Sequence, residues 1–151
     1  ILTICLSITG IYDFAVIVKG NGPGRRVAVN MNSDLTCWLA EHLDKNDLLL
    51  TPEYSMNEVT MSGVMLYCGW PYYAWSAGYD TNYRAAQAVT IYTTSDSETL
   101  KSTVKQEKIT YILFEEGSEF EQQVCQEKTI AATYEKVYET QDGRIRIYKT
   151  N

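Results

Sequence analysis

Short runs of apolar residues occur at intervals along the chain and predict a set of buried strands. Runs at 48–51, 64–68 and 109–114 are bounded by glycine, proline or charged residues, and a shorter one precedes them at 27–30. Continuous apolar runs of this length are typical of strands that are covered on both faces, as in parallel sheets. We therefore expect a sheet built largely from these segments.

Apolar residues at helical spacing separate the runs. Asn32-Ser33-Asp34 is a helix start, because it offers a capping side chain and an acid in the first turn. The face that follows predicts a core helix that includes Trp38, while residues 55–62 could form one or two helical turns. Residues 82–92 predict a further helix, whose expected inward residues are Ala85, Ala86, Val89 and Tyr92.

Two capping-box patterns predict two more helices. Ser95 and Glu98 would open a helix that runs to Glu107, with Leu100 and Val104 inward. Ser118 and Glu121 would open another, with Phe120 and Val124 on one face.

The chain ends in a predicted hairpin. Residues 133–140 and 144–149 flank Gln141-Asp142-Gly143, and Asp-Gly is a strong signal for a tight turn. The alternation of strands and helices predicts an α/β fold, with a mainly parallel sheet flanked by helices and a C-terminal antiparallel hairpin at the edge.

The first eighteen residues admit two interpretations. Leu2, Ile4, Leu6 and Ile8 alternate with smaller or polar residues, which predicts a strand. Residues 1–18 could instead be the end of a membrane-spanning helix, which needs about 20 apolar residues. The glycine-rich stretch that follows predicts a linker at 19–26, and residues 27–151 form a single soluble α/β domain.

Composition excludes several classes of function. The 151 residues suffice for one domain, and a net charge of −6 argues against nucleic acid as a partner. The four cysteines form no C-x-x-C pair and His42 is the only histidine, so we expect no metal, no cofactor and buried free thiols.

The segment 69–84, here called the aromatic segment, is the most unusual part of the chain. It holds two of the three tryptophans and four of the twelve tyrosines, interrupted by Gly69, Pro71 and Gly78. Such density marks either a packed corner or a recognition surface. The segment follows a predicted parallel strand, at the edge where α/β domains bind ligands. The candidate ligand-binding residues there and after the strand at 48–51 are Glu53, Tyr54, Trp70, Tyr72, Tyr73, Trp75, Tyr79, Asp80 and Arg84.

Two enzymatic alternatives fit poorly, and we expect no catalytic residue. Ala74-Trp75-Ser76-Ala77-Gly78 is similar to a nucleophile elbow, but His42 precedes Ser76, against the order that this fold requires. Glycoside hydrolysis needs two carboxylates about 5–10 Å apart, for which Glu53, Asp80, Glu115 and Glu116 are available.

Taken together, the motifs resemble the C-terminal part of bacterial polytopic membrane proteins of the GT-C glycosyltransferase-like type. The resemblance covers about residues 1–84, and its distinctive element is Trp-Ser-x-Gly-Tyr-Asp. The matching residues are Ser7, Gly10 to Asp13, Trp38, Leu48 to Tyr54, Ser62-Gly63, Tyr67, Gly69, Trp75-Ser76, Gly78 to Asp80 and Arg84.

The resemblance implies that residues 1–18 end the last membrane helix. It further implies a noncatalytic accessory domain on the extracytoplasmic side of the cell membrane. Its partners would be the membrane portion of the same polypeptide and a glycan or lipid-linked sugar. The alternative is a purely structural domain that packs on that membrane portion. A small hydrolase is the least favoured alternative.

Overall fold

The computed structural model describes residues 2–20, 30–53 and 58–150, with side chains in the first range described from Gly10 onward. A five-stranded mixed sheet in the order β2-β1-β3-β7-β6 organises the chain. Strands β2, β1 and β3 are parallel, whereas β7 runs antiparallel to both β3 and β6. The strands are β1 (Leu48–Leu50), β2 (Met65–Leu66), β3 (Tyr111–Glu115), β6 (Glu135–Glu139) and β7 (Ile145–Lys149). The predicted α/β class is confirmed, and the β6–β7 hairpin ends the sheet.

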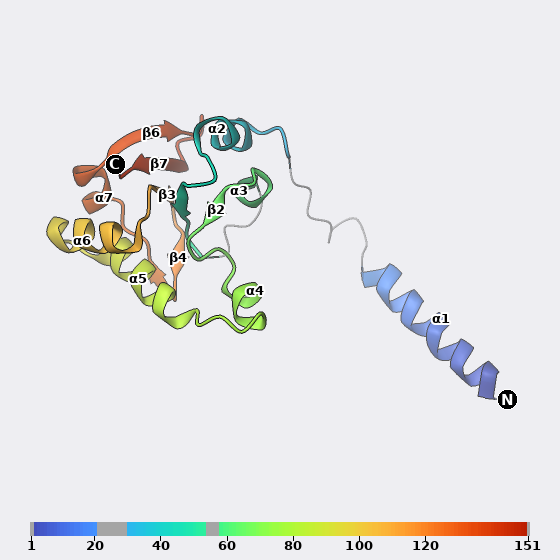
Figure 1. Cartoon of the computed structure of the whole chain (residues 1–151). Coiled ribbons are helices and arrows are strands. Elements are labelled where there is room, and N and C mark those ends of the chain that lie inside the picture. The colour runs from blue at the N-terminus through green and yellow to red at the C-terminus, as the bar shows by residue number, and fades with distance from the viewer. Residues whose placement is uncertain (1, 21–29, 54–57, 151) are drawn as a thin grey trace.

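Helices cover both faces of this sheet (Figure 1). Helices α5 (Asn82–Thr93), α6 (Ser97–Glu107) and α7 (Lys128–Thr133) contribute to one hydrophobic cluster, together with Ile112 and Phe114 of β3. Helices α2 (Asp34–His42) and α3 (Glu58–Met61) contribute to the other, together with Tyr111 and Leu113. Successive side chains of β3 point to opposite faces of the sheet, so this strand contributes to both hydrophobic clusters.

The predicted start of α2 is confirmed. The Ser33 hydroxyl oxygen accepts a hydrogen bond from the Thr36 amide at 3.2 Å and donates to the Glu58 carboxylate at 2.6 Å, which ties α2 to α3. Leu35 and Leu39 are buried, whereas Trp38 is only half-buried at the rim of its cluster.

Helix α5 forms where the sequence predicts it, but the face that it buries differs from the predicted one. Ala85, Ala88, Ile91 and Tyr92 are buried, while Ala86 is exposed and the prediction that it points inward is wrong. The Tyr92 hydroxyl donates to the Leu113 carbonyl at 2.7 Å, so α5 is hydrogen-bonded to the central strand.

Two local predictions fail for identifiable reasons. Helix α6 is capped by Asp96 rather than Ser95, since the Asp96 carboxylate accepts from the amides of Glu98 and Thr99. The predicted helix at 118–124 is instead a two-stranded hairpin of β4 (Glu119–Phe120) and β5 (Gln123–Val124).

The hairpin reverses through Glu121 and Gln122, which have φ of 48° and 62°. Both values lie in the left-handed region, which an α-helix cannot contain. The reversal buries Phe120 and leaves Val124 exposed, so these two side chains do not share a face. Helix α7 follows, in a segment for which the sequence predicted no helix.

The N-terminal segment forms a helix, α1 (Leu2–Gly20), and the strand interpretation is wrong. Its large apolar side chains that the structure describes are exposed; for example, Ile11 is 69% exposed and Phe14 is 67% exposed. In the described part of the chain, no helix combines the length and apolar character that crossing a membrane requires. Residues 27–29 of the predicted strand at 27–30, and 55–57 of the predicted helical turns, lie outside the described residues.

The cysteines that the structure describes are free thiols in different environments. Cys125 is buried, Cys68 is half-buried and Cys37 is exposed, so the prediction of burial is wrong for Cys37. Helix α2 presents Cys37 away from Leu35 and Leu39, on its solvent face.

The α6 cap generates a stability prediction. Asp96→Ala should lower the thermal unfolding midpoint by roughly 2–4 °C, because two amides of the first turn lose their acceptor. Ser95→Ala is the matched control and should leave the midpoint unchanged, as measured by circular dichroism. Equal losses in the two variants would contradict this cap.

The loss of stability caused by Asp96→Ala should depend on pH. Hydrogen bonds from the Thr99 hydroxyl and from the amides of Thr99 and Glu98 lower the pKa of Asp96 below its ordinary value of 3.8. The carboxylate therefore stabilises the fold above that value, and its contribution is lost as the pH falls through the lowered pKa. The difference between wild type and Asp96→Ala should vanish in strong acid, and a difference that grew in acid would contradict the assignment.

Candidate ligand-binding site

The aromatic segment folds into a short helix that lies outside both cores. The left-handed Gly69, with φ of 53°, turns the chain away from β2, and Pro71 opens α4 (Pro71–Ser76) at its first position. Gly78, with φ of 86°, ends the helix and lets its amide bond the Trp75 carbonyl at 2.9 Å. No residue of α4 is buried.

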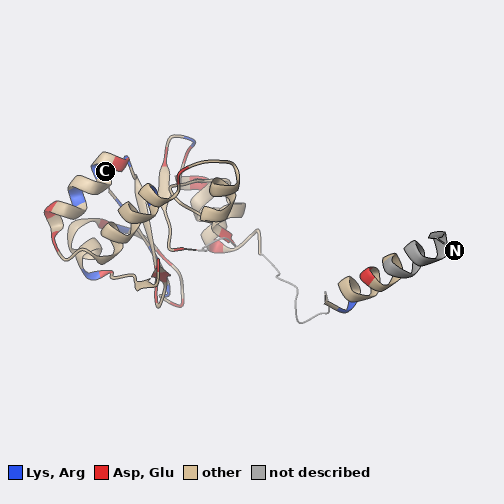
Figure 2. Ribbon diagram, turned by 90° about the horizontal axis from the view of Figure 1, so that it is seen from below, with Lys and Arg blue, Asp and Glu red and all other residues tan. Residues whose placement is uncertain are grey.

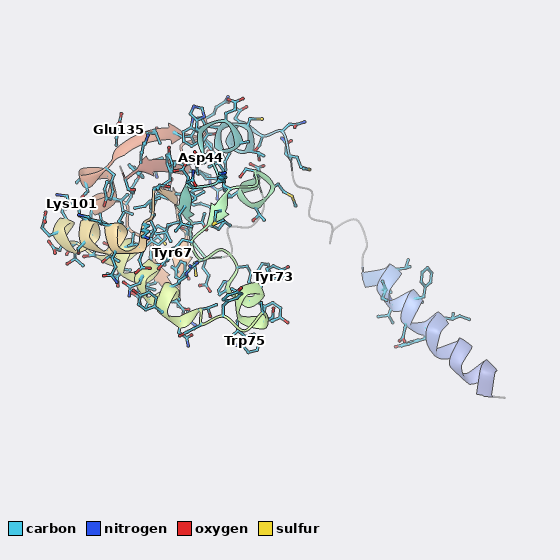
Figure 3. All side chains as sticks on the ribbon, viewed as in Figure 1. Asp44, Tyr67, Tyr73, Trp75, Lys101 and Glu135 are labelled. Atoms are coloured by element: carbon cyan, nitrogen blue, oxygen red, sulfur yellow. The ribbon has the colours of Figure 1, made fainter. Side chains whose placement is uncertain are left out.

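Most aromatic side chains of the segment face solvent, which argues against a packed corner of this domain. Trp75 is 65% exposed and Tyr79 70%, while Tyr72 and Tyr73 are also mostly accessible. In Figure 3, Tyr73 and Trp75 project from α4 at the surface, whereas Tyr67 lies within the body of the domain. The segment is therefore a surface feature rather than a packed corner.

Neighbouring rings on α4 contact one another and form a continuous aromatic face. The centroids of Tyr72 and Trp75 are 6.2 Å apart with planes tilted by 38°, and Tyr72 meets Tyr73 edge-on at 6.1 Å. The ring centroids of Trp70 and Tyr73 are 5.8 Å apart, and Trp70 is 40% exposed. This face, defined here by Trp70, Tyr72, Tyr73 and Trp75, is called the α4 face.

A cavity of about 350 Å³ adjoins α4 and gathers part of the predicted site. Three of the candidate residues, Tyr79, Asp80 and Arg84, line it together with residues from the end of β2. Asp80 uses one carboxylate oxygen to accept the Asn82 amide at 2.9 Å, which fixes the start of α5. The complete lining is Leu66, Tyr67, Cys68, Ala74, Tyr79, Asp80, Thr81 and Arg84.

Arg84 contacts Tyr67 at the wall of this cavity. Its guanidinium donates to the Tyr67 carbonyl at 2.8 Å and lies 5.2 Å from the centre of the Tyr67 ring. Among the described residues, no carboxylate comes within 4.0 Å of it, whereas Arg144 and Arg146 are both ion-paired. Arg84 therefore has no direct ion pair, although its charge acts at longer range on Glu107.

Behind Arg84, two tyrosine hydroxyls donate to Glu107. Tyr67 and Tyr83 reach the carboxylate at 2.8 and 2.7 Å. Partial burial alone would raise the pKa of Glu107, but the hydrogen bonds from Tyr83 and Tyr67 lower it. Burial and the bond to Glu107 together raise the pKa of Tyr67 far above its ordinary value, so its hydroxyl stays protonated as a donor.

Glu53 belongs to a neighbouring cavity. It lies with Pro71, Glu119 and Glu121 at the carboxyl ends of the parallel strands, in a space of about 790 Å³. Its carboxylate accepts the Glu121 amide at 2.9 Å and therefore braces the β4–β5 turn. Tyr54, the remaining predicted site residue, lies outside the described residues.

Several residues considered for the two enzymatic alternatives have other contacts in the structure. Ser76 donates its hydroxyl to the Tyr73 carbonyl at 3.0 Å, and His42 stacks on Trp38 at 4.5 Å on α2, which belongs to the other core. Asp80 and Glu53 line different cavities, and Glu115 pairs with Arg144. Among the described residues, no group of three or more potential ligands could hold a metal ion.

Tyr67 and Glu107 are site residues that the sequence analysis missed. Tyr67 ends an apolar run, and a buried tyrosine usually needs a partner for its hydroxyl, which is the available signal. Its partner is 40 residues further along the chain, a distance over which a single sequence carries no information.

Thiol reactivity tests the position of Arg84. Burial raises the pKa of Cys68, and the Arg84 charge lowers it. Arg84→Gln should therefore slow alkylation of Cys68 at pH 8 about twofold, because less thiolate forms. Peptide-resolved mass spectrometry after iodoacetamide treatment measures this rate. Arg144→Gln is the control, and an unchanged or faster rate in Arg84→Gln would contradict the placement.

No protein-family model matches the chain, and a search of curated proteins finds no significant relative.

Proposed function

We propose that this chain is a noncatalytic domain that binds or positions a glycan through the α4 face and the adjoining cavity. The observation that carries the proposal is the exposure of the α4 face beside a polar cavity. Large aromatic side chains are costly to leave in water unless they serve a contact. Four of them contribute to this one face.

Sugar rings suit such a face. Each pyranose ring carries apolar C–H groups that pack on aromatic rings, while its hydroxyls seek hydrogen bonds at the edge. Tryptophan and tyrosine provide this contact area at little entropic cost, since each has only two side-chain torsions. The tilt of 38° between Tyr72 and Trp75 suits a bent oligosaccharide rather than a flat ligand.

The cavity supplies the polar half of the recognition. Asp80 has one carboxylate oxygen beyond the bond to Asn82, and Arg84 has guanidinium donors beyond the bond to Tyr67. A volume of about 350 Å³ falls in the range of roughly 300–1,000 Å³ found for small-molecule sites. One sugar unit could enter the cavity while its neighbours stack on the α4 face.

The resemblance to GT-C-type membrane proteins gives this activity a context. There the domain would serve as an accessory part on the extracytoplasmic side of the cell membrane, and the ligand would be an acceptor glycan or a lipid-linked sugar. This membrane context is part of the proposal.

A second candidate function is docking on an apolar partner, namely the membrane portion of the same polypeptide. The exposed apolar side chains of α1 favour it, because a helix that is apolar all round is ordinarily buried. In that case the α4 face would be covered by protein rather than by sugar.

A titration separates the two candidates. The full chain, labelled with ¹⁵N, is titrated with neutral gluco-, manno- and galacto-oligosaccharides and followed by NMR. The proposal predicts shifts in residues of α4 and the adjoining cavity with at least one of them. Tyr72→Ala/Trp75→Ala should weaken that binding at least tenfold while the spectrum elsewhere is retained.

Tyr12→Ala is the matched control, since Tyr12 is an equally exposed tyrosine on α1. It should leave glycan affinity unchanged. If no oligosaccharide shifts any resonance, or if the α4 substitutions unfold the domain, the glycan proposal is wrong and docking is favoured.

A further inference from the structure

A further cavity lies at the opposite end of the strands from the α4 face. It has a volume of about 790 Å³ and is bordered by the segments that precede β1 and β3. Val104 and Ile109 form an apolar part of its wall, and lysines of α6 line its rim. We call it the lysine cavity.

The charge of the lysine cavity is opposite to that of the chain. The protein has 19 acids and 13 Lys and Arg residues, yet four lysines and a single acid, Glu135, line this space. Figure 2 shows basic segments on the side of the domain near the C-terminus, and Figure 3 places Lys101 and Glu135 there. The local excess of positive charge marks this cavity as a site for an anion.

Lys101 and Lys105 lie one turn apart on α6, and Lys108, in the left-handed conformation with φ of 56°, ends that helix. Lys101 pairs with Glu98 at 3.1 Å. For Lys105 and Lys108, no carboxylate of the described residues lies within 4.0 Å. The fourth lysine, Lys149, holds its ammonium 5.9 Å from the centre of the Tyr111 ring.

The acids nearest in sequence to the cavity wall are engaged elsewhere. Asn46 lines the cavity between Asp44 and Asp47, and both carboxylates accept backbone amides of that loop, at 2.7 and 2.9 Å. The carboxylates of Asp44 and Asp47 therefore stabilise the turn to which they belong. The positive charges of Lys105 and Lys108 are thus left without a direct protein counter-charge in the described chain.

Tyr134 adds a directed donor. Its side chain is half-buried in the cavity wall, and burial raises the pKa of its hydroxyl, which stays protonated near neutral pH. Among the described residues, the buried side-chain atoms without a hydrogen-bond partner do not include this hydroxyl, so it is open to solvent and accessible to a ligand. A donor and two unpaired ammonium groups around one cavity match the oxygens of a phosphate group.

Lysines near a helix C-terminus also stabilise the helix dipole, and this explains their presence on α6. It does not explain why four lysines line one cavity with a single acid. We propose that the lysine cavity binds a phosphate-bearing anion, with Lys105 and Lys108 as its charge partners and Tyr134 as a hydrogen-bond donor. The phosphate could belong to a soluble compound or to a phospholipid headgroup.

The proposal is independent of glycan binding and has its own test. The full chain is titrated calorimetrically with sodium pyrophosphate at low ionic strength. Lys105→Gln/Lys108→Gln should weaken binding about tenfold or more, and Tyr134→Phe about threefold. Lys19→Gln/Lys128→Gln removes the same charge away from the cavity and should change the affinity less than twofold.

Vesicles distinguish the sources of the phosphate. Flotation with phosphatidylcholine vesicles that contain phosphatidic acid is compared with flotation on phosphatidylcholine alone, which sets the baseline for α1. Lysine-dependent binding only to the acidic vesicles identifies a headgroup, and binding of pyrophosphate identifies a soluble ligand. The proposal is overturned if neither probe binds, or if the control double variant loses as much affinity as the cavity variant.

Discussion

The burial of β3 on both of its faces is the constraint on which the structure depends. Tyr111, Ile112, Leu113 and Phe114 are all less than a tenth exposed, and they alternate between two hydrophobic clusters. Because β1 and β7 flank this strand, both clusters are assembled around it. The Tyr92 hydroxyl, bonded to the Leu113 carbonyl, links α5 to the same strand.

This arrangement leaves α4 without a sheet face to cover. Helices α5, α6 and α7 fill one side and α2 and α3 the other, while β2, from which α4 departs, is a two-residue strand at the edge. The turn at Gly69 carries the chain outward, so the aromatic rings end in solvent. At the other end of the strands, the end of α6 leaves a cavity bordered by lysines. The two proposed sites thus lie at opposite ends of one sheet.

The sequence predicted what depends on local pattern and missed what depends on distant contacts. The Ser33 cap, the apolar strands at 48–51, 64–68 and 109–114 and the Asp-Gly turn carry their signals within a few residues, and these are present. The 118–124 segment looks like a capped helix, but Phe120 is needed in the core beside Tyr92, and a hairpin places it there. Of the site, Tyr79, Asp80 and Arg84 could be found because they are close in sequence. The bond between Tyr67 and Glu107 could not, since only the packing of α6 creates it.

The central claim is that the aromatic segment is surface and not core, and Trp75 tests it most directly. The chain can be labelled with 5-fluorotryptophan, and the ¹⁹F resonance of Trp75 identified by its loss in Trp75→Phe. The account predicts that this resonance shows the solvent isotope shift of an exposed indole on transfer from H₂O to D₂O, larger than that of the half-buried Trp38. A Trp75 shift equal to or smaller than that of Trp38 would contradict the account.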